Sequence, residues 1–294
     1  MRALKSAIGS TRRHGLVVSS SLLAACGHPI AAAPPQRAPL TLTYLGVAGW
    51  QIEGDGKLIL SDPYFSRPAN PDAPLVPDAA AIAAHAPPHA DLVVVGHSHY
   101  DHLLDAPAVA LRTGAKLMGS ESTLRVGRAS GLDADHMLGV KGGEDFELNG
   151  FSVRVIPSLH SVISFGGEVA EAPILPMPSS GYGEGGTFGY LVRLGGREVL
   201  VLDTANFIER ELEGIHPDIA IVAPGLREKI HDYTCRLMRV LGAPPVVLVT
   251  HFDAWHDPPT DQPNEDADTF AAEVRACSPH TRVIVPKHFG RMTL

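Results

Sequence analysis

The chain has 294 residues, of which 45% are hydrophobic and 19% charged, so it can bury a sizeable core and is not disordered along its whole length. Three cysteines against 15 histidines exclude a four-cysteine zinc site but leave room for a metal site of histidine and aspartate. The formal net charge of −8 becomes −12 without residues 1–25, which hold four basic and no acidic side chains. We therefore expect no nucleic-acid partner.

The amino terminus is predicted to be an export signal. Residues 1–25 combine a basic segment with an apolar stretch, residues 16–25, that is too short to span a bilayer. The Leu-Ala-Ala-Cys sequence at residues 23–26 resembles the bacterial lipobox, in which the cysteine is lipidated and becomes the first residue. We expect a lipidated Cys26, a tether over residues 26–39, and an exported lipoprotein on the periplasmic side of the bacterial cell envelope. Only the lipid anchor would then touch the membrane; an ordinary signal peptide is the alternative.

Lipidation of Cys26 would leave two further cysteines, Cys235 and Cys277. In an oxidising compartment these two side chains can form a disulfide. The sequence does not show whether they are close together, so two separate buried thiols remain the alternative.

From residue 40 onward, strand and helix patterns alternate. Strands are expected at residues 40–45, 50–53, 57–61, 91–96, 151–156, 188–194, 198–202, 246–250 and 282–286. The continuous apolar run inside residues 91–96 predicts a strand that is buried on both faces. A helix is expected to begin near Asp105, and two more are expected at residues 228–241 and 268–277. This alternation predicts one layered α/β domain over residues 40–294.

Four side chains that can bind a metal lie within six residues, directly after the apolar strand. They are His97, His99, Asp101 and His102. Layered α/β sheets usually place their sites at the carboxyl ends of strands, and imidazole together with carboxylate suits zinc, iron or manganese. In an extended turn, residues 97 and 99 point the same way while residues 101 and 102 reach a second position. One short loop can therefore serve two adjacent ions, whereas a polar surface loop is the alternative.

This motif is similar to the His-x-His-x-Asp-His signature of the metallo-β-lactamase superfamily, and the resemblance extends over most of residues 40–290. The segments at residues 45–50 and 59–63 resemble the opening hairpins of one branch of it. That branch contains ascorbate-phosphate lactonases and N-acyl-phosphatidylethanolamine phospholipase D. The resemblance implies a four-layer αββα sandwich, which is an α/β fold, and a metal-dependent hydrolase.

The resemblance also implies two groups of metal ligands joined by one bridging carboxylate. The first metal would be bound by His97, His99 and His160. The second metal would be bound by Asp101, His102 and His251. Asp203 would bridge the two metals. For the last imidazole, His251 is preferred over His256 and His288 because the helix and strand before it match the order in the family.

Two adjacent divalent ions, zinc or alternatively iron or manganese, would explain hydrolysis. A water molecule between them becomes hydroxide near neutral pH because metal binding lowers its pKa to about 7, and Asp101 is expected to orient this nucleophile. The resemblance implies that lactam-hydrolysing relatives generally lack a carboxylate such as Asp203. We therefore expect an ester, lactone or phosphodiester bond in a small or lipid-like substrate. The alternatives are a metal-dependent oxidoreductase of the persulfide dioxygenase type, β-lactam hydrolysis, and a lipoprotein that only binds.

A long loop is predicted at residues 166–186, between His160 and Asp203, because this segment is rich in proline and glycine. It either covers the site and accepts an apolar group, or packs on the domain as an inert loop. The sequence leaves both readings open.

Overall fold

The computed structural model describes residues 37–163, 166–253 and 267–294. The predicted signal peptide, Cys26 and His256 lie outside the described residues. All described residues belong to one compact unit.

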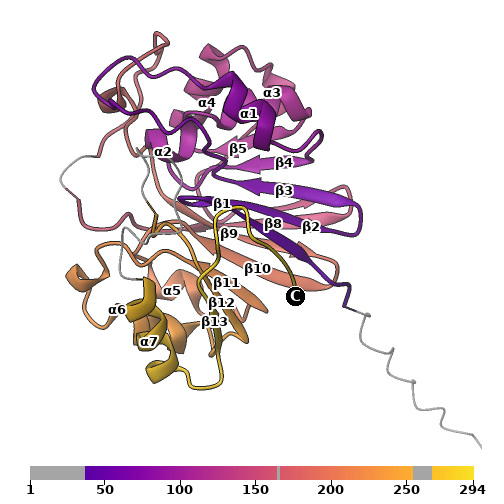
Figure 1. The fold of residues 1–294 in the computed structure, drawn as a ribbon, viewed down its shortest axis with the longest axis vertical. Helices are drawn as coiled ribbons and strands as arrows, with labels where there is room; N and C mark the ends of the chain where they lie inside the picture. Colours follow the sequence, from indigo (N-terminus) through magenta and orange to yellow (C-terminus); the bar gives the residue numbers. More distant parts are fainter. Residues whose placement is uncertain (1–36, 164–165, 254–266) are drawn as a thin grey trace, which may run out of the picture. The chain divides into compact units, whose positions relative to one another are not determined.

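Two seven-stranded mixed sheets form the centre of this unit (Figure 1). The first sheet contains β1 (Thr41–Gly46), β2 (Gly49–Gly54), β3 (Lys57–Ser61), β4 (Leu92–Val94), β5 (Lys116–Gly119), β6 (Met137–Gly139) and β14 (Arg291–Thr293). Its strand order is β14-β1-β2-β3-β4-β5-β6. The pairs from β14 to β3 are antiparallel, and those from β3 to β6 are parallel.

The second sheet repeats this plan. It contains β7 (Asp145–Leu148), β8 (Phe151–Pro157), β9 (Phe188–Leu194), β10 (Arg197–Leu202), β11 (Ile219–Val222), β12 (Val246–Val249) and β13 (Arg282–Ile284). Its strand order is β13-β12-β11-β10-β9-β8-β7. The pairs from β7 to β10 are antiparallel, and those from β10 to β13 are parallel.

Helices cover the outer faces of both sheets. They are α1 (Ala79–His85), α2 (Tyr100–Leu103), α3 (Ala106–Thr113), α4 (Glu121–Ala129), α5 (Glu209–Leu212), α6 (Tyr233–Val240) and α7 (Ala267–Cys277). In Figure 1, α1, α3 and α4 lie beside the first sheet, and α5, α6 and α7 lie beside the second. The layers therefore follow the order helix, sheet, sheet, helix, as the family resemblance implied. Within the described part of the chain, none of these helices has the length and apolarity needed to cross a membrane.

Strand β4 is buried on both faces, as its apolar run predicted. Leu92 and Val94 belong to the core between the two sheets, which also extends under α6 and α7. Val93 belongs to the second core, which lies between the first sheet and its helices. Burial on both sides fixes the register of β4 and hence the position of the residues that follow it.

The helix expected at residues 228–241 is shorter than predicted. Helix α6 begins only at Tyr233, and a 3-10 turn over Arg227–Lys229 precedes it. Asp232 has a left-handed backbone (φ 47°), which separates the two segments. Ile230 still packs against the core from an extended conformation, so the apolar stripe continues although the helix does not.

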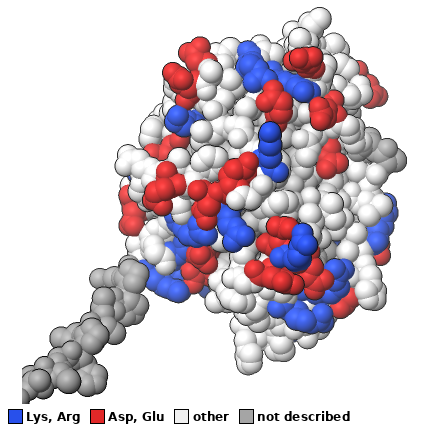
Figure 2. Space-filling view, turned by 180° about the vertical axis from the view of Figure 1, so that it is seen from behind, with Lys and Arg blue, Asp and Glu red and all other residues white. Residues whose placement is uncertain are grey.

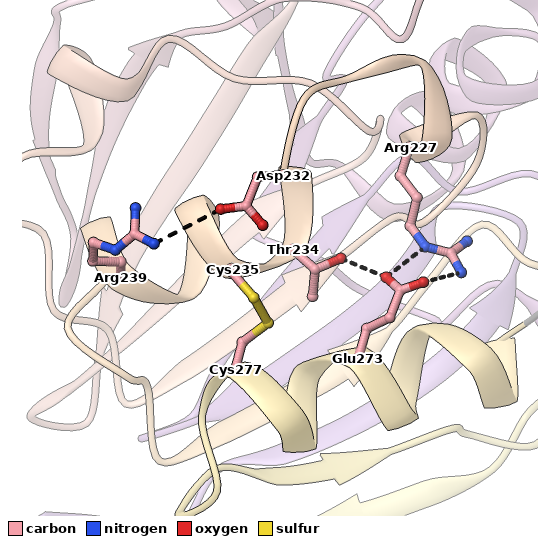
Figure 3. Close-up of a disulfide and its surroundings, with 7 residues drawn as sticks. All are labelled: Arg227, Asp232, Thr234, Cys235, Arg239, Glu273 and Cys277. Carbon is pink, nitrogen blue, oxygen red and sulfur yellow. Dashed lines mark hydrogen bonds and ion pairs between the residues drawn. A yellow bond between two sulfur atoms is a disulfide. The ribbon is translucent and has the colours of Figure 1, made fainter.

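For the last two cysteines, the structure shows a disulfide and not two separate thiols. Cys235 and Cys277 form a bond that joins α6 to α7 (Figure 3). A polar cluster beside it joins the same helices. The carboxylate of Glu273 accepts hydrogen bonds from Arg227 Nε (2.9 Å), Arg227 Nη2 (3.0 Å) and Thr234 Oγ1 (2.7 Å).

Candidate metal centre

The side chains predicted as metal ligands meet at one edge of the sandwich, because each of them follows the carboxyl end of a strand. The residues of the motif follow β4 in the first sheet. His160, Asp203 and His251 follow β8, β10 and β12 in the second sheet. The site therefore depends on the packing of the two sheets against each other.

The first group consists of His97, His99 and His160, whose ligand atoms all lie within 4.8 Å of one another. The Nε2 atoms of His97 and His160 are 3.1 Å apart. His97 and His99 are buried, whereas His160 remains partly accessible from the cavity beside the site. The three rings thus direct nitrogen atoms toward one small volume.

The second group consists of Asp101, His102 and His251, again within 4.8 Å. His251 Nε2 is 3.2 Å from His102 Nε2 and 3.2 Å from Asp101 Oδ2. His251 has a left-handed backbone (φ 53°), and its amide donates a 2.6 Å hydrogen bond to the carbonyl oxygen of Val47. A strained residue of this kind persists only where its surroundings hold it, which is common at functional sites.

Asp203 lies between the two groups and forms a third group with His97 and His102. Its Oδ2 atom is 2.7 Å from His97 Nδ1 and 3.3 Å from His102 Nδ1. Its Oδ1 atom is buried and has no hydrogen-bond partner among the described residues. Gly96 makes room for this carboxylate, since a Cβ atom at that position would collide with it.

Asp62, at the end of β3, is a residue whose role sequence reasoning missed. It is fully buried, and its Oδ1 atom is 3.3 Å from His102 Nδ1 and accepts a 2.9 Å hydrogen bond from the amide of Gly96. Ser61 donates a 2.6 Å hydrogen bond to Oδ2. A carboxylate that ends an apolar strand was the available signal, because it falls at the same sheet edge as the ligands.

The imidazoles of the first group are held neutral. Burial lowers the pKa of His97 and His160, and it lowers the pKa of His99 to about 4. His102 differs: burial acts against its charged form, but the carboxylates of Asp101, Asp62 and Asp203 raise its pKa to about 9.

The site shifts the pKa values of Asp101 and Asp203 in opposite directions. Burial disfavours ionised Asp101, but the charge of His102 and the hydrogen bond with His251 hold its pKa well below the usual range. Burial, followed by the charge of Asp62, raises the pKa of Asp203. Metal ions bind neutral imidazoles and ionised carboxylates. Together with the unpartnered Oδ1 atom of Asp203, this donor set fits a metal centre.

His288, the alternative to His251, lies elsewhere. Its Nε2 atom donates a 2.9 Å hydrogen bond to the carbonyl oxygen of Leu45, and none of the three groups within the described residues includes it. His256 is outside the described residues, so its comparison with His251 stays a prediction.

A cavity of about 530 Å³ opens beside these ligands. The loop predicted at residues 166–186 contributes part of its wall, namely Gly166, Ser179, Ser180, Tyr182 and Gly183. This loop is tied to the metal-binding motif, because the amide of Ser98 donates a 2.8 Å hydrogen bond to the carbonyl oxygen of Glu184. The loop therefore borders the site, but its apolar residues Ile174, Leu175 and Met177 do not line the cavity. Met177 packs instead in the core between the first sheet and its helices, so each of the two readings holds for part of the loop.

An αββα sandwich with histidines and aspartates at its strand ends defines an enzyme of the metallo-β-lactamase fold. Residues 41–223 match the family described as the β-lactamase superfamily domain, and the chain belongs to that family. A UPF0173 metal-dependent hydrolase of Methanopyrus kandleri is 27% identical over 250 residues, which cover 84% of this chain and 96% of the relative.

Solved structures agree on the fold. Igni18, a metallo hydrolase from Ignicoccus hospitalis, has a TM-score of 0.62 and 21% identity, covering 87% of this chain and 98% of that chain. The metallo-β-lactamase fold protein YhfI from Bacillus subtilis has a TM-score of 0.56 and 13% identity, covering 87% of this chain and 100% of that one. The prediction of a metal-dependent hydrolase of the metallo-β-lactamase superfamily is confirmed at this level.

Proposed function

We propose that the chain is a dinuclear metal-dependent hydrolase that cleaves an ester, lactone or phosphodiester bond. The observation that carries this proposal is the meeting of seven donor side chains in three overlapping groups. In this proposal, His97, His99 and His160 bind the first metal. Asp101, His102 and His251 bind the second metal, and Asp203 bridges the two. When bound, two divalent ions, zinc or alternatively iron or manganese, supply a hydroxide nucleophile and stabilise developing negative charge.

The chain's own groups prepare this chemistry. The neutral imidazoles of the first group offer their lone pairs without first losing a proton. Asp101 is ionised and borders the cavity, so it can accept a hydrogen bond from an attacking water molecule and orient that water. Asp62 fixes the ring of His102 from the side opposite to His251. The substrate would occupy the cavity of about 530 Å³ beside them, a usual size for a ligand site.

The carboxylate of Asp203 supports an ester, lactone or phosphodiester over a β-lactam. It lies against both groups, as a shared ligand requires. Together with the opening segments of the sequence, it favours the branch of lactonases and phospholipase D. A redox enzyme of the persulfide dioxygenase type remains the alternative, and it would contain iron.

Metal analysis of residues 27–294 tests the proposal. We expect about two zinc ions per chain in the wild type, and we expect His251→Ala to lose about one ion together with hydrolysis. His288→Ala is the matched control and should keep both ions. One ion in the wild type, or iron with oxygen consumption, would contradict the proposal. A panel of phosphodiester, lactone, thioester and lactam substrates then identifies the bond that is cleaved.

We further propose that the protein is exported to the periplasmic side of the bacterial cell envelope and anchored there through a lipid on Cys26. The lipobox supports this location. The disulfide between Cys235 and Cys277 agrees with it, since disulfides persist in oxidising compartments. Mass spectrometry of the membrane-extracted protein should find an acylated Cys26 as the first residue; another amino terminus would refute lipidation.

We propose that the partners are small or lipid-like substrates and not nucleic acids. The acidic net charge supports this. On the face drawn in Figure 2, Lys and Arg side chains are mixed with Asp and Glu side chains, which does not suit a polyanion. A gel-shift titration with duplex DNA and with RNA at low salt should detect no complex.

A further inference from the structure

We propose that the groups flanking the scissile bond of the substrate are uncharged and partly apolar, as in an alkyl ester, a lactone or a dialkyl phosphodiester. This inference rests on the proposed function and narrows its substrate class. It excludes substrates that carry a carboxylate or a second phosphate beside the bond that is cleaved. It draws on the wall of the cavity and on the cationic side chains around it.

Beyond the proposed metal ligands, the wall of the cavity offers no cationic side chain, since none of the described residues that line it is Lys or Arg. Much of the wall beyond the metal-binding side chains is apolar: Pro71, Ile163, Ala205, Ala223 and Leu226. Hydroxyl groups of Ser179 and Ser180 add neutral hydrogen-bonding atoms. Such a wall contacts alkyl groups and neutral oxygen atoms favourably.

Two arginines, Arg227 and Arg67, lie near the site, but each of them binds a carboxylate outside the cavity. Arg227 directly follows the lining residue Leu226, yet its guanidinium forms two hydrogen bonds with Glu273 on α7 (Figure 3). Arg67 is buried with its side chain 3.3 Å from Asp253. Neither residue lines the cavity.

Lys229 is a cation near the rim of the cavity. Its ammonium group donates a 3.2 Å hydrogen bond to the carbonyl oxygen of Val162, next to the lining residue Ile163, and the contact is exposed. Solvent and salt screen such a charge over roughly 8–10 Å at ordinary ionic strength. It therefore offers little to an anion held within the cavity.

These observations decide against a charged flanking group. Metal ions in the proposed groups would face the scissile bond, so any charge farther along the substrate must be met by the chain itself. Proteins recognise carboxylates and phosphates mainly through Arg and Lys. An anion that leaves water without such a partner loses its hydration and gains no compensating contact.

The test uses substrates that differ in one distal charge. One pair is 4-nitrophenyl pentanoate and mono-4-nitrophenyl glutarate. The other is 4-nitrophenyl butyl phosphate and 4-nitrophenyl 3-carboxypropyl phosphate, in case the enzyme cleaves phosphodiesters. For the zinc-loaded enzyme, we expect kcat/KM at least fivefold higher for the uncharged member of the pair that is hydrolysed. A smaller ratio, or a preference for the carboxylate, overturns the inference and leaves hydrolysis established.

Variants of the wall make the test specific. Leu226→Lys should lower the ratio at least threefold, whereas Leu226→Gln, which is polar but uncharged, should leave it unchanged. Ile163→Lys serves the same purpose at a second position. Lys229→Ala should also leave the ratio unchanged. A Lys229→Ala ratio that rises at least threefold would show that this lysine binds the carboxylate, and would overturn the inference. Absence of hydrolysis in both pairs and of every lactone in the substrate panel contradicts the proposed function itself, and the inference with it.

Discussion

Asp62 lies beside the ring of His102, outside the set of proposed ligands. The ring of His102 presents Nε2 to His251 and Nδ1 to Asp62, at 3.2 Å and 3.3 Å respectively. A carboxylate behind a metal-binding imidazole fixes its tautomer and raises its basicity. Loss of the Asp62 carboxylate should therefore weaken metal binding without removing a ligand.

We expect Asp62→Asn to weaken binding of the second metal about 10–100-fold, because the amide keeps the shape of the side chain but loses its charge. Competition with a chromophoric chelator measures this affinity. Asp135→Asn, an exposed carboxylate, is the control and should bind both ions like the wild type. Equal affinities in Asp62→Asn and the wild type would refute the role of Asp62.

Metal binding should depend on pH differently in the two groups. The pKa of metal-free His102 is raised to about 9, so a metal that enters the second group at neutral pH must displace a proton. The pKa of His99 is lowered to about 4, so the first group is already deprotonated at pH 6. Between pH 8 and pH 6, we expect affinity to fall more steeply at the second site than at the first, by up to about tenfold per unit for each displaced proton. The second site must displace the protons of His102 and of the shared carboxylate of Asp203, whereas the first must displace only that of Asp203. Chelator competition across this range measures both, and parallel losses would contradict the prediction.

At the scale of elements, the segment after β12 is fastened to the turn between β1 and β2. Asp253 Oδ1 accepts hydrogen bonds from the hydroxyl of Tyr44 (2.6 Å) and the amide of Val47 (2.7 Å), and Oδ2 lies 3.3 Å from Arg67 Nη2. The carbonyl oxygen of Val47 in turn accepts the amide of His251. The position of His251 thus depends on a turn about 200 residues away in the sequence.

Removal of this carboxylate should be costly. Asp253→Ala leaves the guanidinium of Arg67 buried without its carboxylate partner, so we expect a loss of about 3–5 kcal/mol in the free energy of unfolding. The double variant Asp253→Ala/Arg67→Met should lose less than the sum of the two single variants, because it removes both charges. Urea denaturation measures all three. A loss below about 1 kcal/mol in the single variant would show that the buried pair is not needed.

Local patterns in the sequence predicted the metal-binding motif better than they predicted the residues that position the ligands. Four proposed ligands lie in six residues after β4, so one apolar run placed them all. Asp62 and Asp253 act across 34 to 209 residues, and only the pairing of strands brings them to the site. The strand Ile219–Val222 was missed although its apolar run resembles β4. Helix α4 was missed although Ser120 caps it by accepting the amide of Thr123.

At the scale of the whole molecule, the disulfide encloses the part of the chain that supplies His251. Its cysteines are 42 residues apart, and β12, His251 and Asp253 lie between them. The other proposed ligands precede this segment in the sequence. The cross-link therefore constrains one of the three proposed ligands from the second sheet, and leaves His160, Asp203 and the motif after β4 outside the closed loop.

Closing a loop of this length lowers the entropy of the unfolded chain, which corresponds to about 4 kcal/mol of stability in the chain-entropy description. We expect the double variant Cys235→Ser/Cys277→Ser to unfold at a lower urea concentration than the wild type, with a loss of about 4 kcal/mol in the free energy of unfolding. Dithiothreitol should bring the wild type to the same midpoint and should leave the double variant unchanged, since the variant has no bond between these positions to lose. Equal midpoints of the wild type and the double variant without reductant would show that the disulfide does not stabilise the fold. An effect of reductant on the double variant would place the sensitivity elsewhere in the chain.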